Sequence, residues 1–274
     1  MGPTSDAPTA EQQQLIEALR GLLLAETQVE ALWLAGSLGK GEGDEYSDVD
    51  LLVLTADGAA AELSRRLAAR LPEVVEPVLV NRLYGGRVLN VVTDDWRRFD
   101  LSLIEASDLA RYDATDLTPL FNRSGRGPPP AVPKPPYRTP PERVVELANE
   151  FLRVLGLSVG ALGRQEHQLA LTGIDILRRL TLDLMLEENN VSPAARGGAL
   201  RRNPFLTDTQ RAQLASLPPL SADNESVIAS NRAFARIFLP RAKRLASRVG
   251  VAWPAPFELA TRRRLKSRLG IDLD

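Results

Sequence analysis

The residues best suited to chemistry are Asp48 and Asp50, two aspartates at the start of an apolar run over 48–54. An earlier apolar run ends in Gly36 and Ser37, and a glycine-rich polar turn joins the two runs. Side chains alternate along a strand, so both carboxylates are expected on one face, about 6–7 Å apart. Such a pair can share divalent cations, while the Gly-Ser turn offers space and backbone N–H groups to a phosphate chain. The spacing therefore predicts metal-assisted chemistry on a nucleoside triphosphate.

A third carboxylate is expected from a neighbouring strand. Asp100 lies in the strand-like run 97–104, where it alternates with apolar side chains. A charge inside such a strand needs a partner, and a metal-binding face would supply one. We predict that Asp100 joins the two earlier aspartates as a catalytic residue, either as a metal ligand or as the general base. An ion pair with Arg98 or Arg82 is the purely structural alternative.

The turn after the first apolar run is predicted to bind the phosphates of the nucleotide. Gly36 leaves room for them, and Ser37 can donate its hydroxyl and N–H to the β- or γ-phosphate. Lys40 could neutralise part of the triphosphate charge, although a solvated turn lysine explains it equally well. Tyr84 and Trp96 lie near expected strand ends, and packing is favoured for them over stacking on a substrate ring.

The elements that must position these residues divide the chain into an α+β half and a helical half. Residues 10–124 are expected to form a catalytic domain, with a mixed sheet of about five strands and flanking helices. A proline-rich stretch, 125–141, cannot be a helix or a central strand and is predicted to be a stiff linker. Residues 142–274 carry only helical patterns, with an interruption expected at Pro240, and should form an up-and-down bundle.

The string from Gly36 to Asp50 resembles the signature of the polymerase-β-type nucleotidyltransferases. In this superfamily a Gly-Ser pair precedes Asp-x-Asp or Asp-x-Glu by roughly ten residues, the spacing found here. The segment from Gly36 to Asp48 is similar to the lincosamide nucleotidyltransferases and, more distantly, to the aminoglycoside nucleotidyltransferases, which modify antibiotics. The lincosamide group commonly has Glu where this chain has Asp50, and either residue can bind Mg²⁺.

The resemblance implies transfer of a nucleoside monophosphate, AMP from Mg-ATP, to a hydroxyl of a small molecule such as a lincosamide or aminoglycoside antibiotic. It implies two Mg²⁺ ions as cofactors and ATP or another nucleoside triphosphate as co-substrate. The helical half would shape acceptor specificity, in the cleft between the two halves, and a homodimer could complete the pocket. A protein-AMPylating, antitoxin-like nucleotidyltransferase is the alternative, although such enzymes are usually much shorter.

The amino-acid composition argues against some other classes of function. The chain of 274 residues has a net charge of −1 and 5% aromatic residues, so an RNA-end-modifying enzyme with a broad basic groove and stacking aromatics is not expected. There is no cysteine, which excludes disulfides and thiolate metal sites. No signal segment or membrane span is apparent, and a cytoplasmic location is the expectation.

Overall fold

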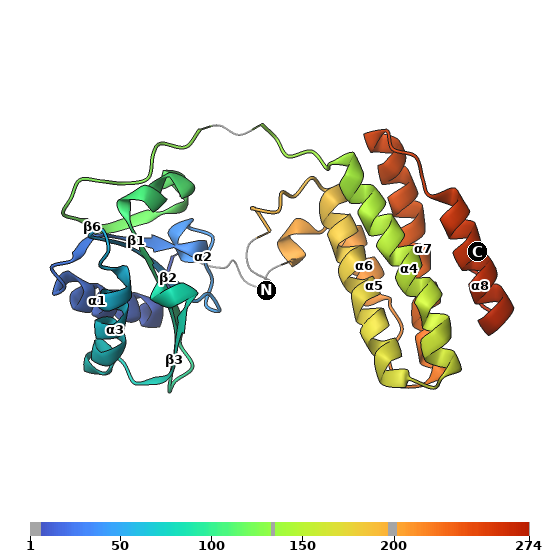
Figure 1. Ribbon diagram of the computed structural model, residues 1–274, viewed down its shortest axis with the longest axis horizontal. Coiled ribbons are helices and arrows are strands. Elements are labelled where there is room, and N and C mark those ends of the chain that lie inside the picture. Colours follow the sequence, from blue (N-terminus) through green and yellow to red (C-terminus); the bar gives the residue numbers. More distant parts are fainter. Residues whose placement is uncertain (1–6, 133–134, 197–201, 274) are drawn as a thin grey trace. The chain divides into compact units, whose positions relative to one another are not determined.

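The computed structural model describes residues 7–132, 135–196 and 202–273, and it divides into two compact units (Figure 1). The first comprises Met1–Lys134 and the second Pro135–Asp274. The first unit contains a mixed sheet with helices, and the described residues of the second form helices and no strand, which confirms the expected α+β class. Residues 133–134 of the predicted linker and residues 197–201 of the predicted helical half lie outside the described residues.

Six strands form one sheet in the first unit, one more than expected. They are β1 (Val29–Ala35), β2 (Val49–Thr55), β3 (Pro77–Leu83), β4 (Val88–Thr93), β5 (Arg98–Ile104) and β6 (Thr118–Asn122). Their order in the sheet is β3-β4-β5-β2-β1-β6. Strands β2 and β5 pair in parallel, and every other neighbouring pair is antiparallel. The parallel pair brings the beginnings of β2 and β5 to the same end of the sheet.

Two helices cover one face of this sheet. The helices of the first unit are α1 (Ala10–Leu24), α2 (Gly36–Gly39) and α3 (Ala60–Arg70), with 3-10 turns η1 (Leu71–Glu73), η2 (Tyr84–Gly86), η3 (Ala106–Arg111) and η4 (Ala114–Asp116). Leucines of α1 and α3 join Leu89, Phe99 and Leu101 of the sheet in the main hydrophobic core. A smaller cluster on the other face packs Leu109 of η3 against Trp33 and neighbouring residues of β1, β2 and β5.

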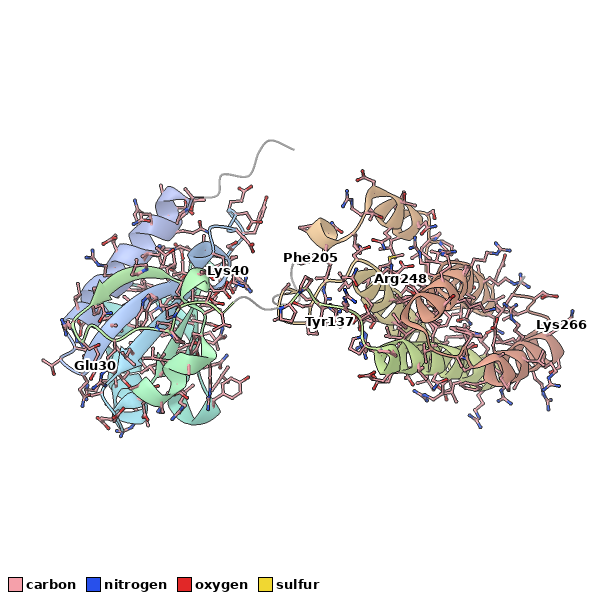
Figure 2. The ribbon with its side chains drawn as sticks, turned by 90° about the horizontal axis from the view of Figure 1, so that it is seen from above. Glu30, Lys40, Tyr137, Phe205, Arg248 and Lys266 are labelled. Carbon is pink, nitrogen blue, oxygen red and sulfur yellow. The ribbon has the colours of Figure 1, made fainter. Side chains whose placement is uncertain are left out.

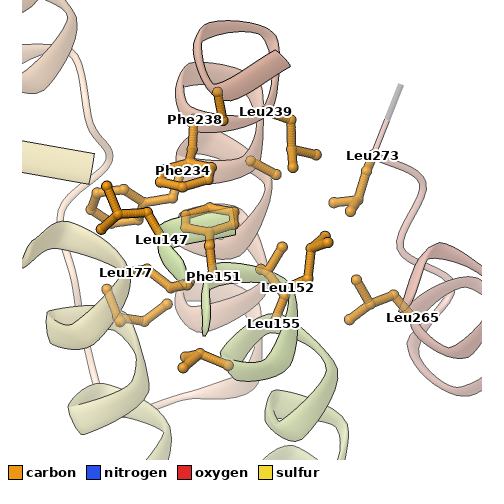
Figure 3. Close-up of a cluster of buried hydrophobic side chains, with 14 of the residues drawn as sticks. Leu147, Phe151, Leu152, Leu155, Leu177, Phe234, Phe238, Leu239, Leu265 and Leu273 are labelled. Carbon is orange, nitrogen blue, oxygen red and sulfur yellow. The ribbon is translucent and has the colours of Figure 1, made fainter. Parts of the chain in front are cut away.

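The second unit is a helical bundle. It contains α4 (Pro141–Gly163), α5 (His167–Glu188), α6 (Asp208–Ala215), α7 (Asn224–Val249), α8 (Ala255–Leu269) and a 3-10 turn, η5 (Asn203–Phe205). Phe151 of α4 stacks on Phe238 of α7 with ring centroids 3.8 Å apart, at the centre of the core (Figure 3). The expected interruption at Pro240 is wrong, because α7 continues through this residue. The flanking Leu239 and Ala242 are buried, and this packing offsets the missing N–H donor.

The segment that enters the bundle is bound to it by polar contacts. The Tyr137 hydroxyl donates to the Glu187 carboxylate over 2.9 Å, and the Thr139 hydroxyl donates to the Glu187 carbonyl oxygen over 2.8 Å. Glu187 is only 1% exposed and also accepts from Arg196. This buried carboxylate therefore fixes the start of the second unit. Within the described residues, no helix is both long and apolar enough to cross a membrane.

Candidate active site

The Gly-Ser pair lies where β1 ends, and it forms the first turn of α2. Gly36 has a φ of +61°, a conformation that favours glycine. A side chain at this position would also collide with the Asp50 carboxylate. Glycine is therefore required here both by the backbone and by the close approach of the second aspartate. This contact places the predicted phosphate-binding turn directly beside the predicted metal ligand.

The polar turn between α2 and β2 is held in place by α1. The Gln12 side-chain amide donates to the carbonyl oxygens of Asp44 and Ser47 over 2.9 and 2.8 Å. The Ser47 hydroxyl in turn donates to the Asp44 carboxylate over 3.0 Å. Gln12 is 7% exposed, so this brace is shielded from water. These hydrogen bonds therefore fix the position of Asp48, the residue that follows the turn.

The sheet brings all three predicted carboxylates together. Strand β2 begins at Val49, one residue later than expected, so Asp48 immediately precedes it. Asp50 lies opposite Asp100 in the parallel β2–β5 register. Asp48, two residues earlier, forms an ion pair with Arg98 over 3.5 Å. The three side chains therefore occupy one face at the end of the sheet where β2 and β5 begin.

Asp100 does not form the arginine pair that the structural alternative required. Arg98 is paired with Asp48, and Arg82 donates to the Ser64 hydroxyl over 3.3 Å. Instead, the Asp100 carboxylate accepts a hydrogen bond of 2.7 Å from the side-chain amide of Asn90. Asn90 lies opposite Asp100 on β4 and was not identified from the sequence.

Burial and neighbouring charges raise the proton affinity of Asp50. Burial, followed by the nearby charges of Asp48 and Asp100, raises the pKa of Asp50 from 3.8 to about 6, and Arg98 opposes the shift. Close like charges are unfavourable unless a cation shares them. The donor set therefore has the chemistry of a divalent cation site.

A divalent cation fits these residues as an open site. In the part of the chain that the structure describes, no group of three His, Cys, Asp or Glu side chains surrounds a metal-sized position. Instead, the Asp48 carboxylate forms an ion pair with Arg98, and the Asp100 carboxylate accepts a hydrogen bond from Asn90. Mg²⁺ needs few protein ligands, because phosphate oxygens and waters complete its octahedron. The arrangement supports a site formed jointly by the aspartates and a bound triphosphate.

The other residues singled out in the sequence are exposed to different extents. Lys40 (Figure 2) forms an ion pair with Asp116 over 3.3 Å, and its side chain is 35% exposed. Its predicted role in phosphate binding stays a prediction. Trp96 and Tyr84 are 78% and 80% exposed, so the favoured interpretation as packing residues is wrong. Trp96 lies in the turn before β5, at the end of the sheet that carries the aspartates.

Comparison with known proteins agrees with this geometry. Residues 13–83 match the sequence model of the nucleotidyltransferase domain family. This stretch includes the Gly-Ser turn, Asp48 and Asp50. The segment of the first unit that carries the site therefore matches a nucleotidyltransferase domain, and this match supports a transferase activity. It agrees with the expectation from the motif.

Solved structures with limited similarity cover nearly the whole chain. An aminoglycoside 6-adenyltransferase from Bacillus subtilis is 16% identical, with 94% of this chain and 98% of that chain covered and a TM-score of 0.41. A nucleotidyltransferase-like protein from Exiguobacterium sibiricum is 15% identical, with coverages of 95% and 89% and a TM-score of 0.33. The E. coli MS115-1 CdnC:HORMA-deltaN complex is 14% identical, with coverages of 97% and 93% and a TM-score of 0.26. No curated protein matches the chain.

Proposed function

We propose that this enzyme transfers a nucleoside monophosphate, AMP from Mg-ATP, to a hydroxyl group of a small molecule. The observation that carries the proposal is the row formed by Asp50 and Asp100 on parallel strands, with Asp48 and the Gly36 turn beside it. This arrangement supports both needs of nucleotidyl transfer, which are a negatively charged metal site and an adjacent space for phosphates.

In the proposed reaction, the acceptor oxygen forms a bond to the α-phosphorus while the bond from that phosphorus to the bridging oxygen of pyrophosphate breaks. Asp100 is proposed to accept the acceptor's proton, and Asn90 holds the carboxylate in place. Asp48 and Asp50 would hold Mg²⁺, with Asp100 as a further ligand. When bound, two such ions neutralise charge on the attacking and leaving oxygens. The N–H groups of the Gly36–Ser37 turn would hold the phosphate chain.

An antibiotic is the proposed acceptor class, because the Gly36–Asp48 string resembles the lincosamide nucleotidyltransferases. The helical second unit is proposed to contribute acceptor specificity. A partner protein is the alternative acceptor, and it would become the preferred one if small molecules were not modified.

The test is pyrophosphate release from Mg-ATP with panels of lincosamides and aminoglycosides. Release that needs one acceptor and is lost in Asp48→Asn and Asp50→Asn proteins would support the proposal. Asp57→Asn is the matched control, because Asp57 is an exposed carboxylate just after β2. Undiminished release by the Asp50→Asn protein would contradict the assignment of the metal site.

A further inference from the structure

One face of the sheet is open over β3 and β4. On the opposite face, Leu89 and Val91 of β4 are fully buried in the main core. The β4 residues that alternate with them are only partly buried. On β3, Leu79 and Leu83 are 45% and 42% exposed. We call the residues of β3 and β4 on this open face the acceptor strip. They are Leu79, Asn81, Leu83, Val88, Asn90 and Val92.

The acceptor strip is continuous with the catalytic row. Register places Asn81 of β3 opposite Asn90 of β4, Asn90 opposite Asp100, and Asp100 opposite Asp50. The Asn90 amide donates to Asp100 over 2.7 Å, and the Asn81 amide donates to the Asn90 oxygen over 3.4 Å. An ionised carboxylate only accepts, so Asn90 must present its NH₂ group to Asp100 and its oxygen to Asn81. The exposed Asn81 amide oxygen can then accept a hydrogen bond from a hydroxyl group.

The six residues of the acceptor strip include no ionisable side chain. By contrast, the neighbouring strands β5 and β2 present Arg98, Asp100 and Asp50 on the same face. A triphosphate and its cations suit the charged half, whereas amides between apolar side chains suit a neutral ring with hydroxyl groups. A ring bearing ammonium groups would meet no carboxylate at these six positions.

We propose that the acceptor strip binds the acceptor, and that the acceptor presents a neutral, hydroxyl-bearing ring of glycoside type to it. This inference rests on the proposed nucleotidyl transfer and names the chemistry of the second substrate. Asn81 binds a ring hydroxyl, and the leucines beside it contact the apolar side of the ring. Asn90 is a positioning residue that fixes the Asp100 carboxylate next to the hydroxyl that reacts.

The absence of cysteine from the chain allows a direct test. An Asn81→Cys protein carries a single thiol on the acceptor strip. Arg82→Cys is the matched control, because Arg82 is the next residue, is also exposed, and contacts Ser64 of α3 on the opposite face. Each protein is treated with a bulky maleimide, and pyrophosphate release from Mg-ATP is measured with neutral alkyl glycosides, lincosamides and aminoglycosides.

The expected result is a loss of acceptor-dependent release, about tenfold or more, after the Asn81→Cys thiol is modified, while the modified Arg82→Cys protein keeps its rate. A neutral-ring acceptor should protect the Asn81→Cys thiol from the maleimide, and Mg-ATP alone should not. Equal effects at both positions, or a preference for polycationic rings, would overturn the inference. It would also fail if the Asn81→Cys thiol were unreactive in the free protein, because another part of the chain or a second copy would then cover the strip.

Separate kinetic measurements test the role of Asn90. Asn90→Leu keeps the size of the side chain but removes the donor to Asp100, so kcat should fall about tenfold or more with the KM for Mg-ATP unchanged. Asn81→Leu should chiefly raise the KM for the acceptor. A fall in thermal stability with both kinetic constants unchanged would make Asn90 a structural residue. Absence of pyrophosphate release with every acceptor would instead contradict the proposed function itself.

Discussion

Removing the charge of Asp50 should make the metal-free protein more stable. Burial, Asp48 and Asp100 raise the pKa of Asp50 from 3.8 to about 6. Each pKa unit is worth about 1.4 kcal/mol, so the ionised carboxylate destabilises the folded protein by at most about 3 kcal/mol. Solvent reaches part of the side chain, so we expect a gain of about 1–3 kcal/mol for Asp50→Asn at about pH 8.

The destabilisation caused by the Asp50 carboxylate should change with pH in a defined direction. Because the folded protein holds this proton more tightly than the unfolded chain, the penalty grows as the pH rises from 3.8 to about 6. Above that range the penalty is fully present, and below it the carboxylate is neutral in both states. The stability difference between Asp50→Asn and the unaltered protein should therefore disappear near the acid end of this range.

The assay is chemical unfolding in the presence of a chelator, repeated with millimolar Mg²⁺. Mg²⁺ should stabilise the unaltered protein and narrow its difference from Asp50→Asn, because the ion binds the folded aspartates. Asp57→Asn, which changes an exposed carboxylate near the end of β2, should change stability by less than about 0.5 kcal/mol. An Asp50→Asn protein that is less stable than the unaltered chain at about pH 8 without metal would refute the electrostatic argument.

Three further predictions follow from the contacts of single residues. Gly36→Ala should abolish transfer and destabilise more than Gly41→Ala, because both glycines have positive φ but only Gly36 approaches a carboxylate; urea unfolding and pyrophosphate release test this. Lys40→Gln should raise the KM for ATP while Asp116→Asn does not, and equal effects would indicate a purely structural ion pair. Glu187→Ala should cost about 3–5 kcal/mol in urea unfolding, since it removes a buried carboxylate and deprives the Arg196 guanidinium of its carboxylate partner, and a loss below about 1 kcal/mol would contradict this.

The residues that the structure brings together in the candidate site could be singled out in the sequence because their signals are local. The Gly-Ser turn and the Asp-x-Asp pair lie within a short string, and strand alternation predicts which side chains share a face. The facing of Asp50 and Asp100 depends on the parallel pairing of β2 and β5. Two strands, β3 and β4, lie between them in the chain, so spacing alone cannot define their register.

Elements without a local signal were missed. Strand β6 contains Pro119 at the edge of the sheet, where a missing N–H donor is tolerated but a strand prediction is weakened. Asn90 is a single amide inside a β-rich run, and no motif distinguishes it. Its importance appears only when the antiparallel pairing of β4 and β5 places it opposite Asp100. Helix α7 shows the converse error, because tertiary packing carried the helix through Pro240 despite its strong local signal.

The strand order would allow one sheet to bind both substrates of the proposed reaction. The central strands β2 and β5 contribute charged side chains to the site face, whereas β3 and β4 contribute amides and apolar groups. Because β4 and β5 are neighbouring strands about 4.8 Å apart, the carboxylates of the candidate site adjoin the acceptor strip, and the two groups share no residue. Substitutions on β3 should therefore change which acceptor is used without changing nucleotide binding. Substitutions of the aspartates should affect the reaction with every acceptor alike, and this separation follows from the order of the strands.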